Sequence, residues 1–410
     1  MTNQQLLVSD EPITVVPGFQ AAGVAAGIKK HGGLDLALVV SERPCSAAAV
    51  FTTNQVQAAP VQYDRSLIEH NSAALRGVVI NSGCANAVTG TQGLQNTIAT
   101  ASAVETALVL PKNSMFVMST GVIGQQLPME HLLPGITTAV EQLDTTLEAG
   151  NNASQAIMTT DTWPKQAAIR YELGGQLFVV AGMCKGAGMI HPNMATLLAL
   201  VCTNAAVTPS ALDVSLRQAT DQSFNCMTVD GDTSTNDTLL VLANGAAGNP
   251  PISLTSGVAL RAFQTALTAV CVELAKMVAR DGEGATKFVT IEVTGARSFE
   301  DARHIGRTIA TSNLVKTAIF GTDANWGRVL MAVGRSGIRI DPRRLALWFG
   351  NVQLVGAGAP LPYDETDAHA ALSDREVVIR VDLGLGGSAA TVWTCDFSHE
   401  YVSINADYRT

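Results

Sequence analysis

Aromatic and charged residues are scarce in this 410-residue chain, at 5% and 15%, whereas 47% of its residues are hydrophobic. This composition predicts a well-packed globular protein and argues against long disordered tracts away from the ends. Lys and Arg form no cluster, and 26 basic against 35 acidic residues give a formal charge of -9. A surface that binds nucleic acid would need a basic patch, so we expect no nucleic-acid partner.

The cysteines and histidines also lack the spacings of known sites. The seven cysteines are dispersed without a C-x-x-C pair, and the seven histidines show no H-x-x-x-H spacing. We therefore expect buried, reduced thiols, with no disulfide framework and no metal. Apolar runs such as 36–40 are too short to span a membrane, and residues 1–5 do not resemble the start of a signal peptide. These features predict a cytoplasmic protein without a membrane partner.

Length and periodicity together predict the architecture. A chain of 410 residues can bury a large core and should form two lobes. Short apolar or alternating runs predict strands at 36–40, 47–51, 77–80, 115–118, 287–294 and 376–383, and a hairpin of 167–173 and 176–181 across a Gly-Gly turn. Helical periodicity predicts helices at 93–110, 129–147, 211–224 and 258–280. We expect loops at 244–256 and 355–367. The pattern predicts an α/β fold with a layered core of sheet and helix.

Residues 185–196 (KGAGMIHPNMAT) stand directly before a short apolar run at 197–201 (LLALV). The run predicts a buried strand that begins at or beside Thr196. Thr196 can be an ordinary strand-edge threonine, because Thr is common in sheets. It can also be a nucleophile, since a threonine hydroxyl becomes reactive when its own α-amine acts as the base. That second role requires the peptide bond before Thr196 to be cut.

Such a cut would begin with attack of the Thr196 hydroxyl on the carbonyl carbon of Ala195. Small residues at Ala195, Gly186 and Gly188 are compatible with the bent backbone that this attack needs. The released α-amine has a reference pKa of about 7.7 to 8.0, and a nearby cation would lower it. Lys185 is a candidate for that cation, with two alternatives: a partner for a substrate carboxylate, or a solvated surface lysine.

Two more segments carry candidate site residues. Thr120 and Gly121 follow the apolar run 115–118, where a sharp turn would expose a hydroxyl and an N–H for a tetrahedral oxyanion. An ordinary turn is the alternative. Glu283 lies between two glycines, and this loop geometry would expose its carboxylate to a substrate ammonium. A solvated loop acid is the alternative there.

Seven segments occur in an order that is typical of one enzyme family. They are 81–87 (NSGCANA), 119–124 (STGVIG), 158–162 (MTTDT), 185–196, 230–237 (DGDTSTND), 325–328 (NWGR) and 404–410 (INADYRT). No segment is specific alone, but the ordered set is. The chain resembles the ornithine acetyltransferases of arginine biosynthesis, also called bifunctional glutamate N-acetyltransferases.

The resemblance implies an autoprocessed enzyme of the N-terminal-nucleophile type. Cleavage between Ala195 and Thr196 would give an α chain of residues 1–195 and a β chain of residues 196–410, assembled as an α2β2 heterotetramer. Thr120 and Gly121 match the oxyanion-hole positions of the family. The positions that match its substrate-binding residues are Thr159, Lys185, Thr196, Glu283, Asn405 and Thr410, with Thr196 as the acyl-accepting nucleophile.

The resemblance also implies a reaction. Thr196 would take the acetyl group from N-acetylornithine, release ornithine, and pass the acetyl group to glutamate in a ping-pong cycle that needs no cofactor. Some family members accept acetyl-CoA as a second donor, and the sequence leaves this open. Two alternatives remain: an amidase or aminopeptidase that passes the acyl group from Thr196 to water, and an amino-acid-binding protein that never cleaves itself.

Overall fold

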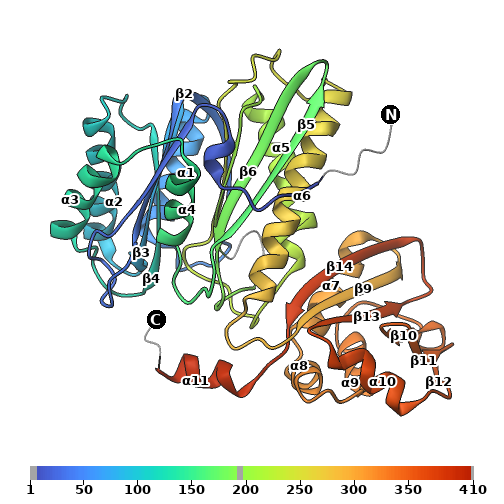
Figure 1. Ribbon diagram of the computed structural model, residues 1–410. Helices are drawn as coiled ribbons and strands as arrows, with labels where there is room; N and C mark the ends of the chain where they lie inside the picture. Colours follow the sequence, from blue (N-terminus) through green and yellow to red (C-terminus); the bar gives the residue numbers. More distant parts are fainter. Residues whose placement is uncertain (1–6, 192–196, 408–410) are drawn as a thin grey trace.

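The structure is a computed structural model that describes residues 7–191 and 197–407. It contains two mixed β-sheets, each with its own helices, and Figure 1 shows them as a larger and a smaller lobe. The strand order β4-β3-β2-β8-β7-β6-β5 defines the large sheet, and β1 pairs with β2. The small sheet has the order β12-β11-β10-β13-β9-β14. The expected α/β class and the two lobes are confirmed.

The large lobe is built from the first eight strands and six helices. Its strands are β1 (Phe19–Val24), β2 (Leu36–Phe51), β3 (Leu75–Cys84), β4 (Met115–Val122), β5 (Lys165–Leu173), β6 (Gln176–Lys185), β7 (Leu198–Thr203) and β8 (Thr238–Ala243); its helices are α1 (Ala59–Asn71), α2 (Gly90–Ala107), α3 (Met129–Glu141), α4 (Leu147–Ala156), α5 (Pro209–Gln222) and α6 (Val258–Arg280). Helices α5 and α6 cover one face of the sheet, and α4 packs against β1 and β2. The strands are apolar on both faces, as expected when both are covered.

The small lobe follows α6 along the chain. It comprises β9 (Phe288–Ala296), α7 (Phe299–Ala310), α8 (Asn313–Phe320), α9 (Trp326–Gly334), β10 (Ala346–Phe349), β11 (Val352–Gly356), β12 (Ala359–Pro360), α10 (Glu365–Ser373), β13 (Glu376–Asp382) and β14 (Ser388–Cys395). Helix α7 packs on β9 and β14. The last helix, α11 (His399–Asp407), leaves this lobe and extends back beneath the large one (Figure 1).

The expected α and β chains do not coincide with the two lobes. Strands β7 and β8 follow residue 196, yet they lie between β2 and β6, which precede residue 195. Strand β7 is antiparallel to β6 and parallel to β8, and β8 is antiparallel to β2. A cut between residues 195 and 196 would therefore leave two ladders of backbone hydrogen bonds joining the pieces within one sheet.

Most sequence-predicted elements are confirmed, with three corrections. The expected strands 36–40 and 47–51 are the two ends of β2, whose first part pairs with β3 and whose last part pairs with β8. The expected helix 129–147 is two helices, and Thr146 caps the second by accepting from the Ala149 N–H. The expected loop 355–367 contains the end of β11, the short β12 and the start of α10. Polar insertions and short elements masked these features in the sequence pattern.

Helix α6 is the one helix of the described residues that is long and apolar enough to cross a membrane, judged by length and composition alone. Its apolar side packs on β5, β6 and α5 in the core, with Phe263, Leu267, Val270 and Leu274 fully buried. Its other side carries charged residues, among them Lys276 and Glu273. This distribution is that of a core helix.

Candidate active site

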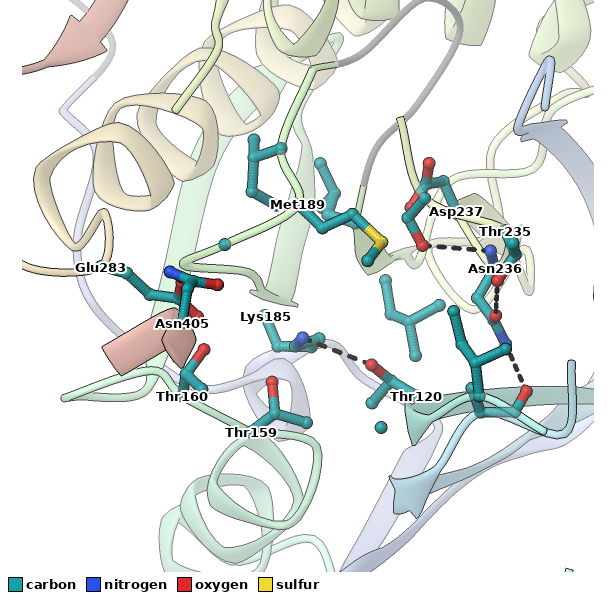
Figure 2. Close-up of a pocket in the computed structure, with 18 residues that line it drawn as sticks. Thr120, Thr159, Thr160, Lys185, Met189, Thr235, Asn236, Asp237, Glu283 and Asn405 are labelled. Atoms are coloured by element: carbon teal, nitrogen blue, oxygen red, sulfur yellow. Dashed lines mark hydrogen bonds between the residues drawn. The ribbon is translucent and has the colours of Figure 1, made fainter. Parts of the chain in front are cut away.

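A pocket lined by the large lobe, the loop after α6 and helix α11 collects most of the expected site residues. It is lined by Thr120, Gly121, Thr159, Lys185, Glu283 and Asn405, and Figure 2 shows five of them labelled around one cavity. Leu197 and Leu198, at the start of β7, line the same pocket. Three further expected residues, Ala195, Thr196 and Thr410, lie outside the described residues. The pocket is thus formed next to the residue that directly follows Thr196 in the chain.

The two residues expected to form an oxyanion hole, Thr120 and Gly121, lie near the end of β4. Gly121 has a φ of 128°, and a Cβ at this position would come within 2.3 Å of the Gly83 carbonyl carbon on β3. Only glycine permits this approach. The sharp turn expected at Thr120-Gly121 is absent, because β4 continues through both residues to Val122, with a register shift against β3 at this point. Asn236 fixes the same strand end, since its amide nitrogen donates to the backbone oxygens of Ser119 (2.8 Å) and Ala85 (2.6 Å).

Lys185, the last residue of β6, points into the pocket beside Thr120 (Figure 2). Its Nζ donates to the Thr120 Oγ1 at 3.3 Å. Because an ammonium group has no acceptor, the Thr120 oxygen accepts here, and its own proton stays available for another group. Lys185 is only 8% exposed, so it is not a solvated surface lysine. Burial lowers its pKa, although the carboxylates of Asp161 and Asp237 oppose this effect.

Beneath the pocket lies a buried charge network that the sequence did not reveal. The Lys165 ammonium is fully buried between Asp161 (2.6 Å) and Asp281 (2.5 Å). Asp161 also accepts from the N–H groups of Gly186 (2.6 Å) and Thr159 (3.0 Å). Burial alone would raise the pKa of Asp161, but Lys165 and Lys185 together lower it to about 2. The carboxylate therefore stays charged and holds two pocket segments in place.

Glu283 lies in the loop between α6 and β9, on the side of the pocket that faces α11. The Asn405 amide donates to its Oε2 at 2.8 Å, and the Glu283 N–H donates to the Ala187 carbonyl at 2.9 Å. A Cβ at Gly188 would come within 2.3 Å of the Glu283 carboxyl group. The absence of a side chain at Gly188 therefore leaves room for this carboxylate at the pocket. The sequence alone suggests only that Gly188 allows a bent backbone. Glu283 is held in place and is not a freely solvated loop acid.

Asp237 is a pocket residue to which the sequence assigns no role. It directly precedes β8, and its carboxyl group is buried against the pocket. Within the described residues its Oδ2 has no hydrogen-bond partner. Burial raises the pKa of Asp237 well above its usual range. Asp237 ends the 230–237 segment that contributes to the family resemblance, but an aspartate at this position indicates no catalytic or binding role by itself.

Comparisons with known proteins show which family the chain belongs to. The model of the ArgJ family matches residues 20–410. The chain belongs to the ArgJ family. The arginine biosynthesis bifunctional protein ArgJ of Symbiobacterium thermophilum is 52% identical over 400 residues, which cover 97% of this chain and 98% of that protein. The mitochondrial protein of the same name from Aspergillus clavatus is 49% identical, covering 96% of this chain and 91% of its own length.

Two solved structures of the family are also similar to parts of the chain. The arginine biosynthesis bifunctional protein argJ from Bacillus halodurans is 40% identical, with a TM-score of 0.49, over 50% of this chain and 96% of that one. The ornithine acetyltransferase from Mycobacterium tuberculosis, complexed with ornithine, is 45% identical, with a TM-score of 0.44, over 47% of this chain and 100% of that one. The family expected from the ordered motifs is confirmed. Because fungal relatives are described as mitochondrial, the cytoplasmic location stays a prediction.

The buried network generates a stability prediction. Lys165→Met should lower the free energy of unfolding by about 3 to 5 kcal/mol, because it leaves the buried carboxylates of Asp161 and Asp281 without their cation. Urea unfolding measures the change in the Thr196→Ala background, where the chain should stay uncut and unfold reversibly. The matched control is Arg217→Met, which removes an exposed ion pair with Asp213 and should cost about 1 kcal/mol or less. Equal unfolding midpoints for the two variants would contradict the structural role of Lys165.

Proposed function

We propose that this member of the ArgJ family is a self-cleaving acetyltransferase of arginine biosynthesis that moves the acetyl group of N-acetylornithine to glutamate. One observation carries the proposal. A single pocket beside the start of β7 contains a hydroxyl and a glycine N–H at a strand end, a buried lysine and a fixed carboxylate. These are the groups that acyl transfer to a threonine at position 196 would need.

The first reaction is the cleavage of the chain itself. The Thr196 hydroxyl oxygen bonds to the Ala195 carbonyl carbon while the bond from that carbon to the Thr196 nitrogen breaks. The hydroxyl proton passes to the nitrogen, and water then hydrolyses the resulting ester. The products are the α chain of residues 1–195 and the β chain of residues 196–410, with a new α-amine on Thr196.

The second reaction is the ping-pong transfer. The α-amine takes the proton of the Thr196 hydroxyl, which then attacks the acetyl carbonyl of N-acetylornithine. The Thr120 hydroxyl and the Gly121 N–H donate to the oxyanion, in keeping with the free proton on Thr120. The bond from the acetyl carbon to the ornithine nitrogen breaks, the α-amine returns its proton to that nitrogen, and ornithine leaves. The glutamate amine then attacks the ester carbonyl, gives up a proton to the α-amine and releases the Thr196 hydroxyl. Positive charge on Lys185 would lower the pKa of the α-amine, keeping more of it neutral.

Substrate recognition follows from the charges around the pocket. The Glu283 carboxylate, held by Asn405, is placed to receive the distal ammonium of N-acetylornithine. Lys185 is the cation available for a substrate carboxylate, in competition with its bond to Thr120. Thr159 and Thr410 complete the proposed binding set. The cycle uses no cofactor, acetyl-CoA is an additional candidate donor, and we propose an α2β2 assembly of the cleaved chains.

Cleavage is tested on the purified protein. Wild-type protein should separate on a denaturing gel into pieces of about 195 and 215 residues. The pieces should coelute on gel filtration, since β7 and β8 lie between β2 and β6. Thr196→Ala should remain one chain and lack transferase activity, because it has no nucleophile. Full transferase activity from an uncleaved wild-type chain would contradict the proposal.

The oxyanion role is tested at Thr120. Thr120→Ala should lower kcat for acetyl transfer by about 10² to 10³, which is the usual cost of one lost oxyanion donor. Self-cleavage should slow as well if both reactions use the same donors. Thr120→Ser keeps the hydroxyl and serves as the matched control. Unchanged turnover in the alanine variant would remove Thr120 from the mechanism.

Donor recognition is tested at Glu283. Glu283→Gln should reduce kcat/KM for N-acetylornithine by about tenfold to a hundredfold more than for an acetylated amino acid without the distal ammonium, because a charge-assisted hydrogen bond worth about 1.5 to 3 kcal/mol is lost for only one donor. Cleavage should survive, since no substrate is present in that step. Equal losses for both donors would show that Glu283 supports the loop and does not select the donor.

A further inference from the structure

Residues 228–237 and the adjoining first residue of β8 hold the chain on both sides of the cleavage junction. Upstream of it, the Asp230 carboxylate accepts from the N–H groups of Met189 (2.6 Å) and Ile190 (2.9 Å), and the Thr233 hydroxyl donates to the His191 carbonyl (3.0 Å). Downstream, the N–H of Thr238, the next residue, donates to the Leu197 carbonyl (2.8 Å). The junction at 195 and 196 is therefore flanked by two backbone anchors from one short stretch of chain.

The upstream anchor holds an unfavourable backbone conformation. Met189 has a φ of 55°, which is uncommon for a residue with a side chain. Such a conformation persists only where the surroundings enforce it, and it is frequent at functional sites. Here the enforcing group is Asp230, which accepts from the Met189 N–H itself. The chain thus enters the segment before the junction in a direction that it would not adopt alone.

A chain of side-chain hydrogen bonds extends the upstream anchor to the small lobe. The Nη2 of Arg307, on α7, lies 2.7 Å from the Nε2 of His191. The Nδ1 of His191 lies 3.1 Å from the Thr228 hydroxyl oxygen. That hydroxyl in turn donates to the Ile190 carbonyl at 2.9 Å. None of Arg307, His191 and Thr228 lines the pocket that holds the described site residues.

Only one arrangement of protons satisfies this chain. A guanidinium has donors alone, so the Nε2 of His191 accepts from Arg307. The ring proton is then on Nδ1, which donates to the Thr228 oxygen, and the Thr228 proton points to the Ile190 carbonyl. Burial, together with the Arg307 charge, lowers the pKa of His191 to about 4, so the ring is neutral around pH 7 and can accept. Each member fixes the orientation of the next.

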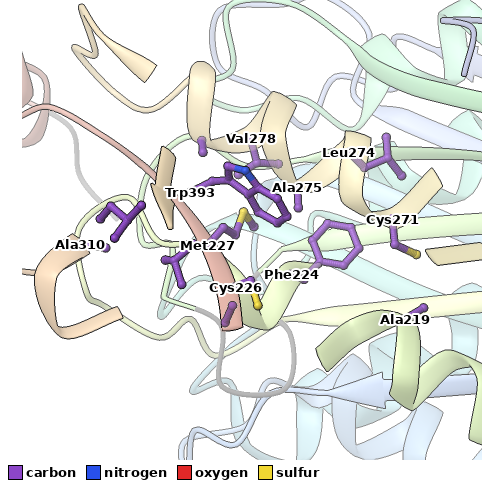
Figure 3. Packing of buried hydrophobic residues seen from close by; sticks show 14 of the residues in the cluster. Ala219, Phe224, Cys226, Met227, Cys271, Leu274, Ala275, Val278, Ala310 and Trp393 are labelled. Atoms are coloured by element: carbon purple, nitrogen blue, oxygen red, sulfur yellow. The ribbon is translucent and has the colours of Figure 1, made fainter. Parts of the chain in front are cut away.

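The residues before Thr228 are anchored by apolar packing. Phe224, Cys226 and Met227 are buried against Trp393 of β14 and the inner side of α6, as Figure 3 shows. The Thr228 N–H also donates to the Trp393 carbonyl at 3.0 Å. Thr228 is therefore attached to both lobes, and its hydroxyl is a rigid support for Ile190.

We propose that Arg307, His191 and Thr228 are positioning residues for self-cleavage, and that they have no role in acetyl transfer once the chain is cut. They fix the backbone at Ile190 and His191 and thereby restrict how the bond after Ala195 can be presented to the Thr196 hydroxyl. This inference rests on the proposed function. It assigns a part in processing to the small lobe, through a helix that supplies no residue to the pocket described above.

The test compares two rates in one variant. Arg307→Met should slow the appearance of the 195- and 215-residue pieces in timed cell-free synthesis by about tenfold to a hundredfold, the loss expected for one charge-assisted hydrogen bond. In the fraction that has been cut, kcat per β chain should stay within about twofold of wild type. Arg307→Lys keeps a donor and should restore part of the cleavage rate.

A matched control and a second variant complete the design. Arg303 lies one helical turn before Arg307 on α7, but its ion pair is with Asp221. Arg303→Met removes that ion pair and leaves the contact of Arg307 with His191, so cleavage should proceed at the wild-type rate. Thr228→Val removes only the hydroxyl and should slow cleavage as Arg307→Met does, which decides the matter if the arginine variant fails to fold.

Two results would overturn the inference. One is cleavage at the wild-type rate in both Arg307→Met and Thr228→Val. The other is a loss of kcat in the cut protein that equals the loss in cleavage rate, because that would indicate a general disturbance of the pocket. A wild-type chain that is never cut at residue 195 would be a different failure, since it would refute the proposed function itself whatever the variants do.

Discussion

The pocket depends on one buried negative charge, the carboxylate of Asp161. A carboxylate in the interior is tolerated only when cations and hydrogen-bond donors replace its lost water, and Asp161 obtains both from Lys165 and from two backbone N–H groups. Those N–H groups belong to Thr159 and Gly186, in the two segments that carry proposed substrate-binding residues. The requirement to solvate this charge therefore determines how the two segments approach each other.

The same charge influences Lys185, which points into the pocket (Figure 2). Lys185 is buried, which favours its neutral form, while Asp161 favours its charged form. A lysine balanced in this way can orient Thr120 through a hydrogen bond and still respond to a substrate carboxylate. Glu283 lies on another side of the pocket and is held by Asn405. Opposite charges on separate sides suit an amino-acid substrate that carries both an ammonium and a carboxylate group.

Sequence patterns could predict what is local, and the ordered motifs could predict the family. The Gly-Gly hairpin between β5 and β6 follows from turn chemistry, since Gly174 and Gly175 both have positive φ. Lys165 follows Asp161 by only four residues, but the two share no helix that would predict their pairing, and Asp281 lies 116 residues further along the chain. The contact of Arg307 with His191 spans the same separation. No periodicity encodes such contacts, because they arise from the way α6 and the small sheet pack.

The position of β7 and β8 inside the large sheet has a consequence for the life of the enzyme. Before the cut, these strands reach their places by an intramolecular search, at the high effective concentration that a continuous chain provides. After the cut, refolding would require two separate molecules to meet, each with unpaired strand edges exposed to aggregation. Unfolding of the cut form would then be effectively irreversible, and its persistence would be set by an unfolding rate rather than by an equilibrium. The uncut chain could refold after unfolding, whereas cleaved protein that unfolds would have to be replaced by new synthesis.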